Sequence, residues 1–129
     1  MCVAFCMDIN QTGTLILDAA FTVHRSIGPG LLESVYENCV LSEMIERGLS
    51  VESQVPLPLI YKNKHLGVGY RADIKVNHSV LVEIKSVETL NEVHIAQMLT
   101  YLKISNCKLG YLINFNCVKL QDGIRRIIL

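Results

Sequence analysis

The spacing of the apolar residues changes near position 50, and this change constrains the fold more than any other feature of the sequence. Before Gly48 the apolar residues recur every three to four positions, which predicts amphipathic helices. After Val51 they alternate with polar residues, which is typical of half-buried strands. The sequence therefore predicts an α/β (α+β) fold, in which two helices come first and most of the strands follow.

The expected helices before Gly48 cover 14–27 and 31–47, and a Gly-Pro-Gly stretch separates them. Thr14 is the expected N-cap of the first helix, and Gly48 is placed to end the second. The rest of the chain is expected to form strands at 55–61, 66–76 and 80–87, a helix at 89–104, and strands at 108–115 and 118–129.

Local signals support the later elements. Pro56 and Pro58 remove backbone donors from their strand, which favours an edge position in the sheet. Thr89 and Glu92 have the spacing of a capping box and are expected to open the third helix. The last strand is expected to bend at the Asp122–Gly123 pair.

The composition indicates a single domain without a membrane segment. The chain has 129 residues, of which 50% are hydrophobic and 19% charged, so 1–129 can bury a core and is not disordered. No apolar run approaches the ~18 residues of a membrane span, and the start lacks the basic residues of a signal peptide. We expect a cytoplasmic protein with residues 1–11 as an N-terminal extension.

The five cysteines are odd in number and form no C-x-x-C pair, so reduced thiols are expected. Cys2 and Cys6 could share one face of a short turn, but no further ligands stand near them, which disfavours zinc.

The zero net charge hides an asymmetry between the two parts of the chain. Residues 1–57 carry two basic and seven acidic residues, a net of −5, whereas residues 58–129 carry ten basic and five acidic residues, a net of +5. The second part could therefore present a basic face to a polyanion, or its charges could be neutralised within the fold by salt bridges.

The expected hairpin at 66–87 brings two carboxylates together. If the apolar residues of both strands pack on one core, Asp73 and Glu83 must share the other face. A two-residue turn would pair position 73 with position 82, so the connection should contain an odd number of residues or a bulge.

Two interpretations of this acidic pair stay open at this point. Mg²⁺ prefers hard oxygen ligands and is usually held by one or two carboxylates. Lys85 lies two residues after Glu83 on the same face, roughly 6.6 Å along the strand at ~3.3 Å per residue, where it could balance charge on a phosphate. Alternatively, Arg71, Lys75 and Lys85 form a surface ion-pair ladder with the two acids.

The third expected helix carries polar residues on one stripe. Gln97 and Tyr101 are four positions apart, and His94 precedes Gln97 by three. They are either ordinary residues of an amphipathic helix or part of a site. For His94 a role on the helix surface or in support of the site is favoured over metal ligation.

Several motifs follow one another in a familiar order. Gly30, Glu33 and Tyr36 fit the pattern G-x-x-E-x-x-Y. The later motifs are G-Y-R-A-D at 69–73, V-E-I-K at 82–85, V-H at 93–94, Q-x-x-x-Y at 97–101, L-I-N-F at 112–115 and D-G-I at 122–124. Over roughly residues 12–128 the chain resembles the GxxExxY proteins, a branch of the PD-(D/E)XK nuclease superfamily. Each motif alone is weak, but their ordered combination is specific.

The resemblance implies a single nuclease-like domain with a restriction-endonuclease-like core, a central mixed β-sheet flanked by helices in the order α-α-β-β-β-α-β-β. In the superfamily, the metal ligands match Asp73 and Glu83, and the main-chain carbonyl of the residue after the second acid, here Ile84, can also bind the metal. The catalytic lysine matches Lys85.

The resemblance adds three further site residues. Glu33 matches an additional acid that many members use to bind a second metal ion or its waters. Gln97 and Tyr101 match an element that supports the site or touches the substrate backbone. The first position of the superfamily motif, Pro in its name, is Ala72 here, which puts little in doubt.

Together these features predict a metal-dependent nuclease that hydrolyses DNA or RNA with Mg²⁺, for which Mn²⁺ can substitute. A homodimer would enlarge the small basic face. Two alternatives remain: a non-catalytic module that keeps the fold and binds nucleic acid or a protein, and a purely structural or interaction role.

Overall fold

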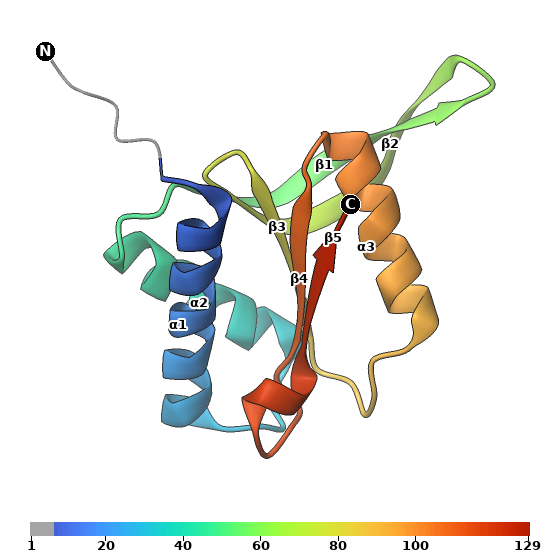
Figure 1. The fold of residues 1–129 in the computed structure, drawn as a ribbon. Coiled ribbons are helices and arrows are strands. Elements are labelled where there is room, and N and C mark those ends of the chain that lie inside the picture. The colour runs from blue at the N-terminus through green and yellow to red at the C-terminus, as the bar shows by residue number, and fades with distance from the viewer. Residues whose placement is uncertain (1–6) are drawn as a thin grey trace, which may run out of the picture.

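The computed structural model describes residues 7–129, which form a five-stranded sheet with helices on both faces (Figure 1). The elements are α1 (Ile9–Ile27), α2 (Glu33–Glu46), β1 (Val51–Tyr61), β2 (Lys64–Val76), β3 (Val80–Lys85), α3 (Glu92–Ser105), β4 (Leu109–Asn114), the 3₁₀ helix η1 (Leu120–Gly123) and β5 (Ile124–Ile128). This order confirms the predicted one and adds only η1.

The strands lie in the order β1-β2-β3-β4-β5, so β1 and β5 are the edges. All neighbours are antiparallel except β3 and β4, which are parallel. A parallel pair needs a crossover connection, and α3 provides it. The sheet is therefore mixed, as the resemblance implied, and the edge position predicted from the prolines of β1 is confirmed.

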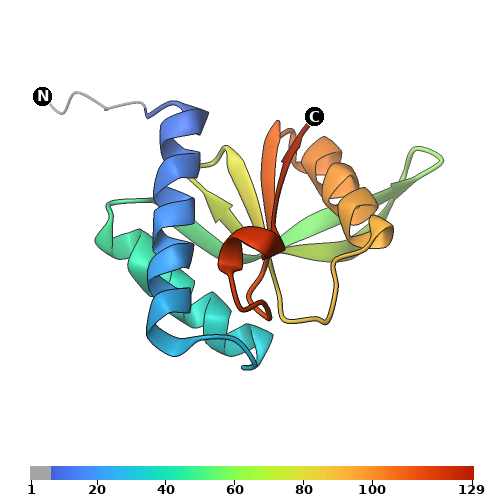
Figure 2. The ribbon, with the colours of Figure 1, turned by 60° about the horizontal axis from the view of Figure 1, so that its bottom comes forward.

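The sheet lies between two core clusters, and helices cover both of its faces (Figure 2). Helices α1 and α2 cover one face, where Ile16, Val40 and Ile84 are fully buried in the larger cluster. Helix α3 covers the other face, where Met98 and Leu112 are fully buried in the smaller one. Because side chains alternate along β3 and β4, each of these central strands contributes to both clusters.

Two helix starts differ from the prediction. Asp8, not Thr14, caps α1: its Oδ1 accepts from Gln11 N at 2.8 Å, and the Gln11 side chain accepts from Asp8 N at 3.1 Å. Helix α1 therefore begins at Ile9, inside the stretch assigned to an N-terminal extension. Thr14 lies within the helix and donates to the carbonyl of Asn10.

Helix α3 is capped by Asn91 instead of Thr89. The Asn91 side-chain oxygen accepts from Val93 N and His94 N, and His94 Nδ1 accepts from Asn91 N at 3.1 Å. The expected capping box of Thr89 and Glu92 is thus wrong, because the chain offers an equivalent box two residues later, where Asn replaces Thr and His replaces Glu.

The strand limits also differ. Strands β1 and β2 are longer than predicted, and together they form a hairpin that extends beyond the body of the molecule (Figure 1). Strand β3 ends at Lys85 instead of 87, because Asn114 Oδ1 accepts from Val87 N and takes that residue out of the ladder. Strand β5 starts only at Ile124, since Gly123 packs closely on the carbonyl of Asn114 and turns the chain there.

Among residues 7–129, Cys39, Cys107 and Cys117 carry free thiols, as predicted. The predicted face shared by Cys2 and Cys6 lies outside the described residues. None of the helices in the described part of the chain is long and apolar enough to span a membrane.

Candidate active site

Asp73 and Glu83 lie at the point where the hairpin of β2 and β3 forks. The ladder runs from the Val76–Val80 pair to the Ile74–Val82 pair and stops there. The connecting turn has three residues, 77–79, so the predicted odd count is confirmed. The next step of this register would set Asp73 opposite Glu83.

Side chains replace the backbone ladder at the fork. The Asp73 N–H donates to Glu83 Oε1 at 2.8 Å, and the Ile84 N–H donates to Asp73 Oδ2 at 2.8 Å. Each carboxylate therefore bonds to the backbone of the other strand, and the two acids are held side by side. The predicted convergence of these two residues is confirmed.

Within the described part of the chain, no basic side chain forms an ion pair with either acid of the fork. The ion pairs among residues 7–129 join Arg47 to Asp18, Arg47 to Glu43, and His78 to Glu52. None of them involves the acids at the fork, so the alternative of a surface ion-pair ladder is wrong in this structure.

Burial of Glu83 makes its charged form costly. Glu83 is only 3% exposed. Burial and, after it, the charge of Asp73 raise the pKa of Glu83 to about 8, against the opposing effects of the hydrogen bond from the Asp73 backbone and of the charge of Lys85. An incoming cation would relieve this cost by favouring the ionised carboxylates.

Lys85 is the last residue of β3 and is half-buried. Its charge lowers the pKa of Glu83, although no ion pair within residues 7–129 involves it. Ile84, between the two, is fully buried and packs in the larger core cluster, which fixes the backbone that carries both charged neighbours.

The G-x-x-E-x-x-Y motif builds the approach to α2. Gly30 has a φ of 92°, a conformation that L side chains rarely adopt. The Tyr36 hydroxyl donates to the carbonyl of Gly28 at 2.6 Å and accepts from Leu31 N at 3.1 Å. Tyr36 also stacks on Phe115 of the segment after β4, with ring centroids 4.5 Å apart. The motif thus holds the loop from which α2 starts.

This loop is tied to the end of β3. The Ser86 hydroxyl donates to the carbonyl of Leu31 at 2.6 Å. Glu33, the first residue of α2, therefore lies two residues after Leu31, whose carbonyl is hydrogen-bonded to the residue that follows Lys85. Its side chain is exposed, and it influences the pKa of Glu37 one turn later.

Glu37 and Gln54 were not predicted from the sequence to be site residues. Gln54 Nε2 donates to both Glu37 oxygens, at 3.0 and 3.2 Å, and lies 3.5 Å from Asp73 Oδ1. Burial raises the pKa of Glu37, the Gln54 hydrogen bond lowers it, and the charges of Asp73 and Glu33 raise it. Glu37 therefore links the start of α2 to the acidic pair.

Gln54 itself has unusual geometry. It lies in β1 opposite Asp73, where the ladder skips one step, and its φ is 50°. A non-glycine residue in the left-handed region costs free energy, and residues in such strained conformations cluster at functional sites. No local pattern marks Gln54 in the sequence, whereas the spacing of Glu33 and Glu37, four positions apart on one helix, was a usable signal.

Helix α3 presents one aromatic residue to the site. Tyr101 is buried in the smaller core cluster, on the face of the sheet that α3 covers. Burial raises the pKa of Tyr101, and the charges of Glu83 and Asp73 raise it further. Tyr101 also contacts Tyr70, with ring centroids 5.4 Å apart. Gln97 is half-buried one turn earlier on α3, and His94 completes the capping box described above.

Within the described part of the chain, no group of three or more His, Cys, Asp or Glu side chains is arranged to hold a metal ion. The fork offers two carboxylates, and Glu33 and Glu37 stand farther out. This donor set fits Mg²⁺, which is typically held by one or two carboxylates and completes its shell with waters and substrate oxygens.

Comparison with known proteins agrees with this geometry. The family model described as the PD-(D/E)XK nuclease superfamily matches residues 10–127. No curated protein and no solved structure matches the chain significantly. Because the matched region covers almost the whole sequence and includes both acids of the fork, the chain belongs to the PD-(D/E)XK nuclease superfamily.

Proposed function

We propose that this protein hydrolyses phosphodiester bonds of nucleic acid with a divalent metal ion held by Asp73 and Glu83. The observation that carries the proposal is the fork itself: two adjacent carboxylates, one of them 3% exposed, with no ion pair to neutralise them in residues 7–129. Folding gains nothing from placing like charges together, so a bound cation is the physical reason for keeping them there.

The ion would be Mg²⁺, with Mn²⁺ as a substitute, because both accept carboxylate and carbonyl oxygens. Asp73 and Glu83 supply two ligands, and the main-chain carbonyl of Ile84 supplies a third. When bound, the ion would polarise the scissile phosphate and acidify the attacking water.

The remaining residues act around that position. Lys85, which forms no ion pair among the described residues 7–129, orients the attacking water and offsets negative charge that develops on the phosphate. Glu33 holds waters or a second ion, and Glu37, which reaches Asp73 through Gln54, completes this outer acidic group.

Residues of α3 position the substrate and the fork. Tyr101 closes one side of the acidic pair and contacts Tyr70, while Gln97 reaches the sugar-phosphate backbone from the same helix. The fastened loop of Gly30, Glu33 and Tyr36 supports the finer assignment of the chain to the GxxExxY branch of the superfamily.

The decisive experiment is a cleavage assay on labelled DNA and RNA, single- and double-stranded, with Mg²⁺ or Mn²⁺ and with EDTA. We expect cleavage that needs the metal ion and falls roughly 10²–10³-fold or more in Asp73→Asn, because one charged ligand is lost. Glu46→Gln removes an exposed acid outside the fork and outside the quoted motifs, and it serves as the matched control.

Two outcomes would contradict the proposal. One is cleavage in EDTA or undiminished cleavage by Asp73→Asn. The other is nucleic-acid binding by the wild type without cleavage under any condition, which is what a non-catalytic binding module would give.

A further inference from the structure

The hairpin of β1 and β2 extends from the site as a cationic arm. We define the arm as residues 58–69, which end in the turn at Lys62 and Asn63. Every residue from 60 to 69 is exposed, including the apolar side chains of Ile60 and Leu66, each 54% exposed. Figure 1 shows the arm reaching beyond the body, away from both core clusters.

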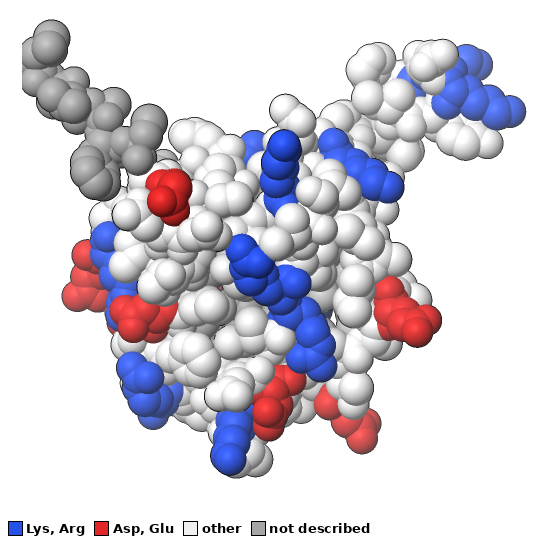
Figure 3. Space-filling view, in the orientation of Figure 1, with Lys and Arg blue, Asp and Glu red and all other residues white. Residues whose placement is uncertain are grey.

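The charge of the arm has one sign. Between Ser53 and Ala72 there is no acidic residue, whereas Lys62, Lys64 and Arg71 are basic. Basic side chains stand at the end of the arm in Figure 3, where no red residue lies beside them. The Lys62 ammonium lies 5.6 Å from the centre of the Tyr61 ring. In a chain of zero net charge this separation indicates a polyanionic partner for the arm.

The base of the arm is fixed against the body. Leu57 is 4% exposed in the cluster under α3, and Tyr70 contacts Tyr101. Gly69 packs so closely on Leu59 that an added Cβ would come within 2.8 Å of its side chain. The arm therefore leaves the body in a set direction, from the same two strands that carry Gln54 and Asp73.

The reach of the arm falls just short of one helical turn of duplex DNA. Lys64 precedes Asp73 by nine residues, which span at most about 30 Å at ~3.3 Å per residue. One turn of B-form DNA is roughly 34 Å long. A rigid tip at this distance meets the substrate at a set position only if the substrate is stiff, and duplex DNA is stiff over about 50 nm.

The width of the arm fits the same partner. Paired strands lie about 4.8 Å apart, and the major groove of B-form DNA, about 12 Å wide, admits a two-stranded ribbon. The major groove of A-form RNA is too narrow for side chains to read. We infer that the arm grips double-stranded DNA about one helical turn from the phosphate bound at the fork. This inference rests on the proposed function and names its substrate class.

A second copy of the chain is a less suitable partner. Strand β1 is an edge, but Pro56 and Pro58 lack the donors that an added strand would need next to the arm. The apolar side chains of the arm stand among lysines, which favours contact with thymine methyl groups and sugars over burial in a dry interface.

The test compares Lys62→Ala/Lys64→Ala with Lys108→Ala/Lys119→Ala, which removes the same charge from exposed sites on the body. Binding to a 30-bp DNA duplex, a 30-nucleotide single strand and a 30-bp RNA duplex is measured by fluorescence anisotropy without divalent ions. For the arm variant we expect about 10-fold weaker binding to duplex DNA and a salt slope lower by about two. Its affinity for the single strand and the RNA duplex, and all affinities of the body variant, should stay within about twofold of wild type.

Each other outcome overturns the inference. Unchanged binding of duplex DNA by the arm variant would show that the arm does not contact it. Equal losses on all three probes, or in the body variant, would show a general charge effect. Tyr61→Ser/Leu66→Ser that turns a dimer into a monomer in sedimentation would show that the arm joins two copies.

The same experiment separates the arm from the chemistry. Asp73→Asn should bind duplex DNA at least as well as wild type while failing to cleave it. An arm that behaves as expected in a wild-type protein that never cleaves would refute the proposed function alone. Cleavage by the wild type together with an unaffected arm variant would refute the arm alone.

Discussion

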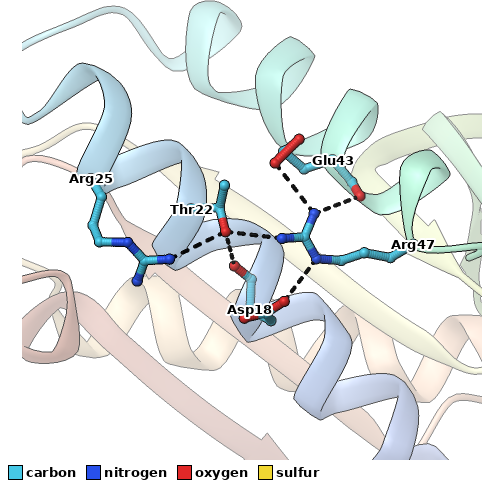
Figure 4. Close-up of polar contacts among 5 residues, drawn as sticks. All are labelled: Asp18, Thr22, Arg25, Glu43 and Arg47. Carbon is cyan, nitrogen blue, oxygen red and sulfur yellow. Dashed lines mark hydrogen bonds and ion pairs between the residues drawn. The ribbon is translucent and has the colours of Figure 1, made fainter.

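Two acidic regions of this molecule differ in whether a basic side chain pairs with their carboxylates. Between α1 and α2, Arg47 donates to Asp18 Oδ2 at 2.9 Å, to Glu43 Oε1 at 3.3 Å and to Thr22 Oγ1 at 2.9 Å (Figure 4). The hydrogen bond to Asp18 raises the pKa of Arg47, which stays charged. At the fork, Asp73 and Glu83 lie side by side, and neither forms an ion pair within residues 7–129.

This difference distinguishes a region whose charges are paired within the fold from a region that can bind a cation. The Arg47 network is closed, because both acids pair with the one guanidinium of Arg47, and its role is to join two helices. The fork is open, because its excess negative charge is balanced only when a cation arrives. A stabilising region and a binding region can thus be distinguished by how their charges are compensated.

The largest expected effect separates Lys85 from the other bases of the hairpin. Lys85→Ala should lower cleavage roughly 10²–10³-fold, because a charge beside the phosphate is lost, and should leave the melting temperature nearly unchanged. Lys75→Ala, on the same hairpin, should retain most of the activity. A much lower melting temperature of Lys85→Ala, or equal losses of cleavage activity in both variants, would instead favour the ion-pair ladder.

The next effect is a gain of stability at the fork. In the folded protein the pKa of Glu83 is raised from 4.5 to about 8, so Glu83 ionises more easily in the unfolded chain. The contribution of protonated Glu83 to the stability is therefore complete below about pH 4.5 and is lost as the pH rises through about 8. Glu83→Gln removes this cost without changing shape. We expect about 4–5 kcal/mol of added stability at pH 8.5 without metal ions.

Urea unfolding of Glu83→Gln and wild type at pH 4 and pH 8.5 checks this expectation. The gain should vanish at pH 4, where Glu83 is protonated in both states, and Mg²⁺ should stabilise only the wild type. A variant less stable than wild type at pH 8.5 would mean that the fork is already compensated.

Tyr36→Phe tests the loop that leads to Glu33. Loss of the hydroxyl removes the hydrogen bonds to Gly28 and Leu31 and should destabilise the fold by about 1–2 kcal/mol. Activity should fall as well, since the start of α2 loses one of its fastenings. Tyr61→Phe, on the arm, gives the control for a lost exposed hydroxyl. A Tyr36→Phe protein with wild-type stability would show that the hydroxyl does not fasten the loop.

The smallest effect is expected in the closed network. Arg47→Ala should destabilise the protein by about 1 kcal/mol, because the freed Asp18, 58% exposed, regains water. The difference should shrink between about 0.1 M and about 1 M NaCl. Activity per folded molecule should not change. A loss of activity without a loss of stability would erase the proposed contrast between the two regions.

Much of the fold was predictable because its signals are local. The change of period near position 50 predicts the order of the elements, and the alternation along 66–87 predicts that Asp73 and Glu83 converge. The helix caps were mistaken because Asn91 and His94 satisfy the same hydrogen bonds as the Thr and Glu pattern.

The outer part of the site could not be predicted from local signals. Gln54 reaches Glu37 and Asp73 only because α2 and β1 pack beside each other, and nothing in its neighbourhood announces a left-handed conformation within a strand. The extent of the arm was also missed, since alternation along a strand does not reveal whether either face meets a core.

The central claim is that the fork holds a divalent ion. The most direct measurement is an anomalous-difference map from crystals of the wild type soaked in Mn²⁺, with Asp73→Asn crystals treated in the same way. We expect a peak between the carboxylates of Asp73 and Glu83 in the wild type that disappears in the variant. An empty fork in the wild type, or a peak that Asp73→Asn leaves unchanged, would contradict it.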